Sequence, residues 1–189
     1  MAKSNYKHKN SKENKIELFD DYGICYMLHD QLFYFDIDDF QLVKNHYWSM
    51  TATGYAASYY FTRDDNNKRK HHIMLFHRQV MNAPSNMDVD HINRDKLDNR
   101  KHNLRVCQSI QNDYNKSISK RNKSGVIGVS YNNQNNTWRA YITYKGEWIN
   151  LGSYSDKTDA IVARLQAERD YFCEFAPQQD LFDLYNIEH

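Results

Sequence analysis

The stretch that decides the fold is VDHINRDKLDNRKHNLRV at residues 89–106, followed by SIQNDYNK at residues 109–116. Two short apolar runs, VDHI and NLRVC, flank a polar loop, which predicts two strands joined by that loop. Ser109 precedes a polar segment of helical composition and is predicted to cap a helix. The order strand, loop, strand, helix therefore predicts a small ββα unit.

Adjacent side chains in this unit are suited to two separate tasks. Asp90 and His91 follow one another on a predicted strand, so their side chains point to opposite faces. A helix packed over the hairpin would bring Asn112 beside Asp90, and carboxylate and amide oxygens are hard ligands that suit Mg²⁺ or Mn²⁺. His91 has an ordinary pKa of ~6.5 and can take a proton from water near neutral pH. Asn103 begins the second strand and can hold the loop or His91 through its amide.

The whole string, with the lead-in LFHRQVM (75–81), resembles the HNH endonuclease family, in the subgroup common among phage and intron-encoded nucleases. The resemblance covers residues 72–117. It implies that His91 is the general base, that Asp90 and Asn112 are metal ligands, and that Asn103 is the central, orienting Asn. Asn stands here where other members have a third His, a variation that the family tolerates.

The resemblance also implies a reaction and a cofactor. One Mg²⁺ (or Mn²⁺) is expected, because two protein ligands are few for a two-metal site, and the products would carry 5′-phosphate and 3′-hydroxyl ends. The chain lacks the cysteines with which some HNH proteins bind a zinc ion, so no structural zinc is expected. Arg78, Arg105 and His77 are weaker candidates for phosphate contacts.

The segment before this motif is rich in short β runs. KIELF, ICYMLH and LFYFD are separated by aspartate-containing turns, residues 37–45 suit a short helix, and three more strands follow up to Phe76. Residues 1–70 are therefore predicted to form a small antiparallel β-rich unit. Three roles stay open for it: a further DNA-contacting unit, a dimer interface, or a scaffold.

The segment after the motif predicts three strands and a helix. The strands are GVIGVSY (125–131), TWRAYITY (137–144) and EWINLGSY (147–154), and Ser155 is predicted to cap the helix. Ile161, Leu165 and Phe172 share one face of that helix. Residues 119–175 are therefore predicted to be a sheet packed on one helix, and residues 176–189 an acidic tail that drapes over the core or frays.

This last unit resembles the Apetala/ethylene-response-factor DNA-binding domain in Gly128-Val129, TWRAYI, WINLGSY and the helix alanines. In that family the sheet lies in the major groove. Alternation puts Ala140 and Ile142 on the inner face and a polar, basic and aromatic set on the outer one. The residues expected to contact DNA are Ser130, Asn132, Arg139, Tyr141, Thr143, Lys145, Trp148 and Asn150. Fewer arginines stand there than in plant members.

Charge is distributed unevenly along the chain. The net charge is +1, but residues 71–150 carry 12 Lys and Arg against 6 Asp and Glu, and residues 151–189 carry 3 against 8. A polyanion is therefore expected to bind the middle of the chain. The three cysteines lie far apart and no apolar run is long enough to cross a membrane. These features predict a cytoplasmic protein without a membrane partner.

Together the patterns predict an α+β fold with three units: 1–70, the ββα-metal motif over 71–118, and 119–175 before the tail. The expected function is a metal-dependent, site-specific DNA endonuclease of the homing or phage type that acts on double-stranded DNA as a monomer or homodimer. Two alternatives stay open. One is a type II restriction endonuclease acting as a dimer, and the other is a non-catalytic DNA-binding regulator.

Overall fold

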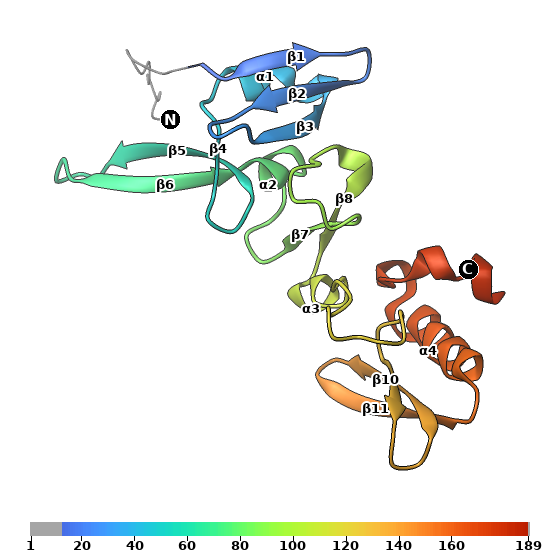
Figure 1. Cartoon of the computed structure of the whole chain (residues 1–189). Coiled ribbons are helices and arrows are strands. Elements are labelled where there is room, and N and C mark those ends of the chain that lie inside the picture. The colour runs from blue at the N-terminus through green and yellow to red at the C-terminus, as the bar shows by residue number, and fades with distance from the viewer. Residues whose placement is uncertain (1–12, 189) are drawn as a thin grey trace. The chain divides into compact units, whose positions relative to one another are not determined.

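The structure is a computed structural model that describes residues 13–188, and it divides into two compact units after Cys107 (Figure 1). The first unit contains the β-rich segment together with the strands of the HNH-like motif, and the second begins at Gln108. Several small antiparallel sheets and few helices give an α+β fold, as predicted. The domain boundaries at residues 70 and 118 stay predictions.

The first unit holds three sheets. The strands β1 (Lys15–Leu18), β2 (Tyr22–Tyr26) and β3 (Leu32–Asp36) form an antiparallel meander, followed by a 3₁₀ turn and α1 (Phe40–Lys44). The second sheet contains β4 (Ser49–Met50), β5 (Ala56–Arg63) and β6 (Arg69–Leu75), and β6 leads directly into α2 (Phe76–Val80). The third is the two-stranded hairpin of β7 (Asp88–His91) and β8 (Leu104–Cys107).

An aromatic core joins the first two of these sheets. Alternation along β3 buries Phe33 and Phe35, which pack with Trp48 and Phe76 in one cluster, all four fully buried. The Phe76 ring lies 4.8 Å from Phe33 and meets Trp48 edge-on at 5.0 Å between ring centroids. Phe76 is the first residue of α2, so the helix that precedes the β7–β8 hairpin is anchored in this core. Truncating such a ring to alanine costs about 3–5 kcal/mol.

The loop between β7 and β8 is tied to the edge of β3. The Tyr34 amide donates to the Leu97 carbonyl at 2.8 Å, and the Asn99 amide donates to the Tyr34 carbonyl at 3.0 Å. Two backbone hydrogen bonds fix the loop in register with a strand that lies about sixty residues earlier in the chain. The N-terminal sheet therefore acts as a scaffold for the loop beside His91.

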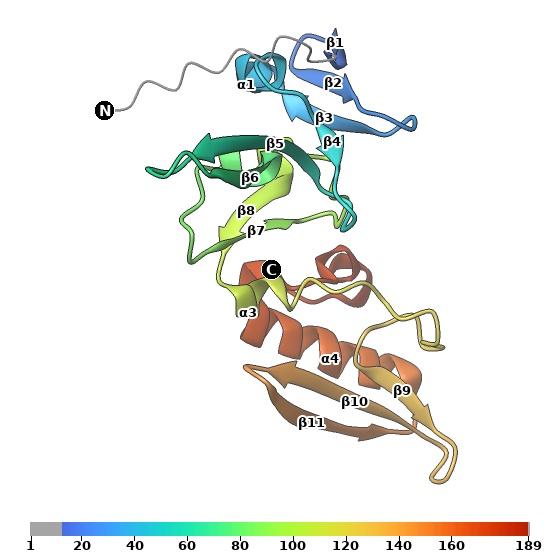
Figure 2. The same cartoon turned by 90° about the vertical axis from the view of Figure 1, so that its left-hand side faces the viewer.

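The second unit is a three-stranded antiparallel sheet with one long helix. After α3 (Ser109–Asn112), the sheet contains β9 (Val129–Asn132), β10 (Thr137–Tyr144) and β11 (Glu147–Tyr154), with β10 in the centre. The helix α4 (Lys157–Phe172) lies along one face of the sheet (Figure 2). Three short 3₁₀ turns, Cys173–Phe175, Gln179–Leu181 and Asp183–Tyr185, complete the unit.

The core of the second unit lies between the sheet and α4. Ala140 and Ile142 on β10 pack against Ile161 and Leu165 on the helix, each at most 3% exposed. Phe182, in the acidic C-terminal segment, is 2% exposed in the same core. The segment therefore drapes over the core. No helix within residues 13–188 is long and apolar enough to cross a membrane.

Three local predictions for this unit were wrong. The N-cap of α4 is Asp156, whose carboxylate accepts from the Thr158 amide at 2.6 Å, not Ser155. The N-cap of α3 is Gln108, in a capping box with Gln111, not Ser109. The first strand begins at Val129 rather than residue 125, because the glycines at 125 and 128 have φ of +81° and +78° and turn the chain.

Candidate active site

The β7–β8 hairpin presents Asp90 and His91 on its two faces. Asp90 pairs with Arg105 across the hairpin and His91 pairs with Leu104. Both side chains are buried, Asp90 6% and His91 4% exposed, and neighbouring residues of a strand point to opposite sides. The predicted separation of the carboxylate from the imidazole is therefore present.

The His91 ring is oriented by a buried amide. Its Nε2 lies 3.2 Å from Oδ1 of Asn99, which is fully buried, and Asn99 Nδ2 donates to the Lys96 carbonyl at 3.5 Å. Because the amide nitrogen faces the Lys96 carbonyl, its oxygen faces the ring and accepts from Nε2–H. This hydrogen bond leaves the lone pair on Nδ1, the nitrogen that can accept a proton.

A second histidine packs against the first. The His77 ring lies 5.2 Å from the His91 ring and 4.8 Å from the Tyr55 ring, between centroids. Burial, with a smaller contribution from neighbouring His91, lowers the pKa of His77 to about 3. Burial also lowers the pKa of His91, although its hydrogen bond to Asn99 opposes this. Both rings are therefore neutral at physiological pH, the form in which His91 can act as a base.

Asn103 fixes the loop that carries these groups. Its Oδ1 accepts from the Asn93 amide at 2.9 Å, and its Nδ2 donates to Asn93 Oδ1 at 3.0 Å and to the Asp98 carbonyl at 2.8 Å. Its own carbonyl accepts from the Ile92 amide at 2.8 Å. Of the two tasks expected of Asn103, it performs the bracing of the loop, and Asn99 contacts the imidazole.

Asp90 lies in an ion pair. Its Oδ2 accepts from Arg105 Nε at 2.9 Å and from Nη2 at 2.7 Å. Asn112 is the last residue of α3, in the second unit. A carboxylate and an amide oxygen are donor types that fit a hard divalent cation. Within residues 13–188 no group of three His, Cys, Asp or Glu side chains is placed to hold a metal.

Arg78, a candidate for phosphate contact, braces a neighbouring loop. Its guanidinium donates to the carbonyls of Met87 and Pro84, each at 2.7 Å. The bonds connect α2 to the turn that leads into β7, and so help to position the strand that carries Asp90.

Comparison with known proteins agrees with this geometry. A family model described as HNH endonuclease matches residues 69–114. An uncharacterized HNH endonuclease of Acanthamoeba polyphaga mimivirus is 32% identical over 142 residues, which cover 74% of this chain and 70% of that protein. The chain belongs to the HNH endonuclease family. It is therefore a DNA endonuclease, as the motif predicted.

A second viral protein is also similar to this HNH endonuclease. Protein 3.8 of Escherichia phage T7 is 26% identical over 107 residues, which cover 57% of this chain and 88% of that protein. No solved structure matches the chain significantly. The match to the family covers β6 to α3, so the comparisons do not extend the resemblance to the Apetala-type domain.

The outer face of the C-terminal sheet carries the predicted DNA-contacting residues. Arg139 pairs with Ser130, Tyr141 with Asn150, and Thr143 with Trp148, and cross-strand partners share a face. The Trp148 ring is 55% exposed and stacks on Tyr141 at 5.8 Å between centroids. Alternate residues of β10 are buried against α4, so the predicted division of the two faces is confirmed.

Two further candidates lie at the margin of that face. Asn132 is the last residue of β9, and Lys145 lies in the turn between β10 and β11 with φ of +50°. The Lys145 ammonium lies 5.1 Å from the centroid of the Tyr144 ring.

Sequence reasoning missed Asn99 and gave His77 only a weak role in phosphate contact. Asn99 lies inside the quoted motif, but its contact with His91 depends on the loop being held by Tyr34, and no local pattern encodes that. His77 did carry a signal, because it lies in the LFHRQVM lead-in, and its position on α2 places it against His91.

Proposed function

We propose that this HNH endonuclease cleaves DNA at specific sites, with His91 as the general base, in a homing or phage mobile-element role. The observation that carries the proposal is the His91 ring, which is buried, neutral and held through Nε2 by Asn99. An imidazole held in this way offers Nδ1 to one position in space. The similarity to mimivirus and phage proteins supports the phage-type role.

In the proposed reaction Nδ1 of His91 removes a proton from a water molecule as its oxygen attacks the scissile phosphorus. The bond to the 3′-oxygen breaks, the leaving oxygen takes a proton from a solvent water, and the products carry a 5′-phosphate and a 3′-hydroxyl. His77 and Tyr55 line one side of the imidazole, and because His77 is neutral it does not oppose the proton that His91 gains. The Asn103 network keeps the loop, and with it Asn99, in place during the reaction.

Asp90 and Asn112 are the proposed ligands of one Mg²⁺ or Mn²⁺ ion. When bound, the ion supplies positive charge that stabilises the scissile phosphate and the leaving oxygen as negative charge develops. Arg105 holds Asp90 from the neighbouring strand and is also proposed to contact DNA phosphate, as is Arg78. Arg105 fixes the direction of the carboxylate.

The outer face of the C-terminal sheet is proposed to bind the duplex. Its aromatic, amide and cationic side chains suit a groove, and residues 116–150 contain 6 Lys and Arg against one Glu. A double substitution, Arg139→Gln with Trp148→Ala, is expected to weaken binding while leaving the cleavage rate of bound DNA unchanged. Equal affinity of this variant and the wild type would rule out the face as a reader.

Cleavage of plasmid and genomic DNA tests the catalytic proposal. Wild type and His91→Ala are each assayed with Mg²⁺, with Mn²⁺ and with EDTA, and binding is measured by gel shift on the same DNA. We expect the wild type to cut only with metal, and His91→Ala to bind without cutting. Binding without cleavage by both proteins would favour a DNA-binding regulator. A dimer that cuts both strands symmetrically at a short palindrome would favour a restriction endonuclease.

A further inference from the structure

The β5–β6 hairpin of the first unit projects away from the rest of that unit (Figure 1). It pairs in continuous antiparallel register from Ala57 opposite Leu75 to Arg63 opposite Arg69. Residues 62–71, which include the turn, are all exposed. A two-stranded ribbon that buries few side chains is only marginally stable by itself. Its exposed apolar side chains therefore indicate a surface that binds a partner.

One face of this hairpin is aromatic, aliphatic and basic. Cross-strand partners share a face, which places Tyr59 beside Ile73 and Arg63 beside Arg69. Tyr59 is 59% and Ile73 52% exposed. The Arg69 guanidinium lies 4.7 Å from the centroid of the Phe61 ring on the same face. Apolar side chains flanked by guanidinium groups are suited to contact a partner whose surface is grooved and negatively charged.

The opposite face has the same character. The Tyr60 ring stacks on His72 at 5.0 Å between centroids, and His72 Nε2 lies 2.8 Å from the Thr62 hydroxyl. Lys70 pairs with Thr62 on this face. The outer part of the ribbon therefore carries cations and aromatic rings on both faces, whereas Met74 at its base packs against the aromatic core.

Charge within the first unit favours the hairpin as the side that meets a polyanion. Residues 13–55, which form the β1–β3 sheet and α1, contain 2 Lys and Arg against 8 Asp and Glu, so phosphates are repelled there. Residues 56–75 contain 4 against 2, and one of these two acids, Asp64, accepts from the Asn66 and Lys68 amides in the turn. The acidic residues of the unit are thus concentrated in the segment of the β1–β3 sheet and α1, whereas the β5–β6 hairpin is basic.

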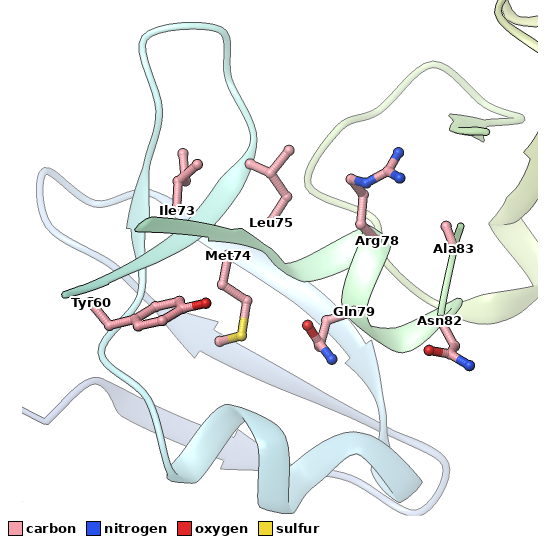
Figure 3. A pocket seen from close by; sticks show the side chains of 8 residues that line it. All are labelled: Tyr60, Ile73, Met74, Leu75, Arg78, Gln79, Asn82 and Ala83. Atoms are coloured by element: carbon pink, nitrogen blue, oxygen red, sulfur yellow. The ribbon is translucent and has the colours of Figure 1, made fainter. Parts of the chain in front are cut away.

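A hollow of about 430 Å³ lies at the base of the hairpin and continues this surface toward α2 (Figure 3). Tyr60 and Ile73 line it from the hairpin, and Arg78, Gln79 and Asn82 line it from α2 and the turn that follows. Hydroxyl and amide groups of this kind bind phosphate and sugar oxygens. The hollow continues the hairpin surface as far as α2, and in the interior of the same unit His77 on α2 packs against His91.

We infer that the β5–β6 hairpin is a DNA-contacting ribbon that grips the duplex beside the cleavage site. Arg63, Arg69 and Lys70 contact phosphates, and Tyr59 and Ile73 rest against sugars and the groove wall. A two-stranded ribbon fits the major groove of B-DNA. The inference rests on the proposed site-specific DNA cleavage and adds a contact surface distinct from the C-terminal sheet.

The test compares two charge-neutralising double variants of the full chain. Arg69→Gln with Lys70→Gln changes the hairpin, and Lys15→Gln with Lys44→Gln removes the same charge from exposed positions on β1 and α1. Affinity for a duplex that carries the mapped cleavage site is measured in EDTA over a range of salt concentrations. Each phosphate contact contributes about −0.9 to the slope of log K against log salt concentration. The hairpin variant lacks two such contacts, so its slope should be less negative than that of the wild type by about 1.8.

We expect the hairpin variant to bind about tenfold more weakly at physiological salt, with its single-turnover cleavage rate at saturating protein unchanged, and the control to match the wild type. Identical slopes for the hairpin variant and the wild type, with normal cleavage by both, would overturn this inference alone. A change in sedimentation from dimer to monomer at an unchanged slope would also overturn it, in favour of self-association. A wild type that neither binds nor cuts duplex DNA would overturn the proposed function as well.

Discussion

Acid should destabilise the first unit through His77. In the folded chain its pKa lies at about 3 because the ring is buried beside Tyr55 and His91, whereas in the unfolded chain a histidine titrates at ~6.5. Above pH 6.5 both states are neutral at this residue, and the stability is fully present. As the pH falls below 6.5, only the unfolded state gains the proton, so stability is lost progressively toward pH 3.

The magnitude follows from the same two values. At pH 5 the folded ring is still neutral and the unfolded one is protonated, so His77 alone removes about 1.5 × 1.36, or roughly 2 kcal/mol, relative to pH 8. Burial also lowers the pKa of His46 and of His91, so the unit as a whole should lose more unfolding free energy than His77 alone accounts for. The variant His77→Phe keeps a ring in the site and removes the titration, which isolates the contribution of His77.

Urea unfolding at pH 8 and pH 5 measures this effect. Trp48 is fully buried in the first unit, and in a background with Trp138→Phe and Trp148→Phe its fluorescence reports on that unit alone. The loss of unfolding free energy between the two pH values should be about 2 kcal/mol smaller in His77→Phe than in the parent. Parallel pH dependence of the two proteins would refute the account of a buried, neutral His77.

Three further predictions concern the second unit and the active site. Gly128→Ala should lower the free energy of unfolding of the second unit by about 2–4 kcal/mol, because φ at this residue is +78° and a Cβ would lie 2.4 Å from the Tyr141 carbonyl oxygen. An unchanged urea midpoint would argue against this turn. Asn99→Leu should slow single-turnover cleavage about 10- to 100-fold with an unchanged circular dichroism spectrum, because the His91 ring loses its orienting bond; full activity would remove Asn99 from the mechanism. Because burial lowers the pKa of His91, the acidic midpoint of the pH profile of kcat/KM should lie below pH 6.5. A midpoint above pH 7 would contradict the assignment of His91 as a base that is neutral at physiological pH.

Period-two alternation and turn chemistry explain why much of the fold could be predicted. TWRAYITY and EWINLGSY are flanked by polar turns, and their strands begin and end at the predicted residues. LFYFD has phenylalanines at alternate positions, and both of them lie in the core. The first predicted strand of the C-terminal sheet began four residues too early, because two glycines with positive φ replace extended backbone there.

The site was predicted less completely because its parts depend on distant contacts. The family motif led to Asp90, His91 and Asn103, which lie on or beside one hairpin. The contact between Asn99 and His91 exists because β3 holds the intervening loop, and no local spacing reveals a bond made through another sheet. Capping was wrong for a different reason: Ser155 and Asp156 are adjacent and both suit an N-cap, so the sequence alone did not choose between them.

Chemical rescue of His91→Ala tests the central claim most directly. The cleavage rate of bound DNA is measured in single turnover, with Mg²⁺ at fixed concentration and with increasing free imidazole. The account predicts a loss of about 10²–10⁴-fold for the variant, unchanged DNA affinity, and partial recovery that follows the concentration of neutral imidazole. A variant that cleaves at the wild-type rate without imidazole would contradict the assignment of His91 as the general base.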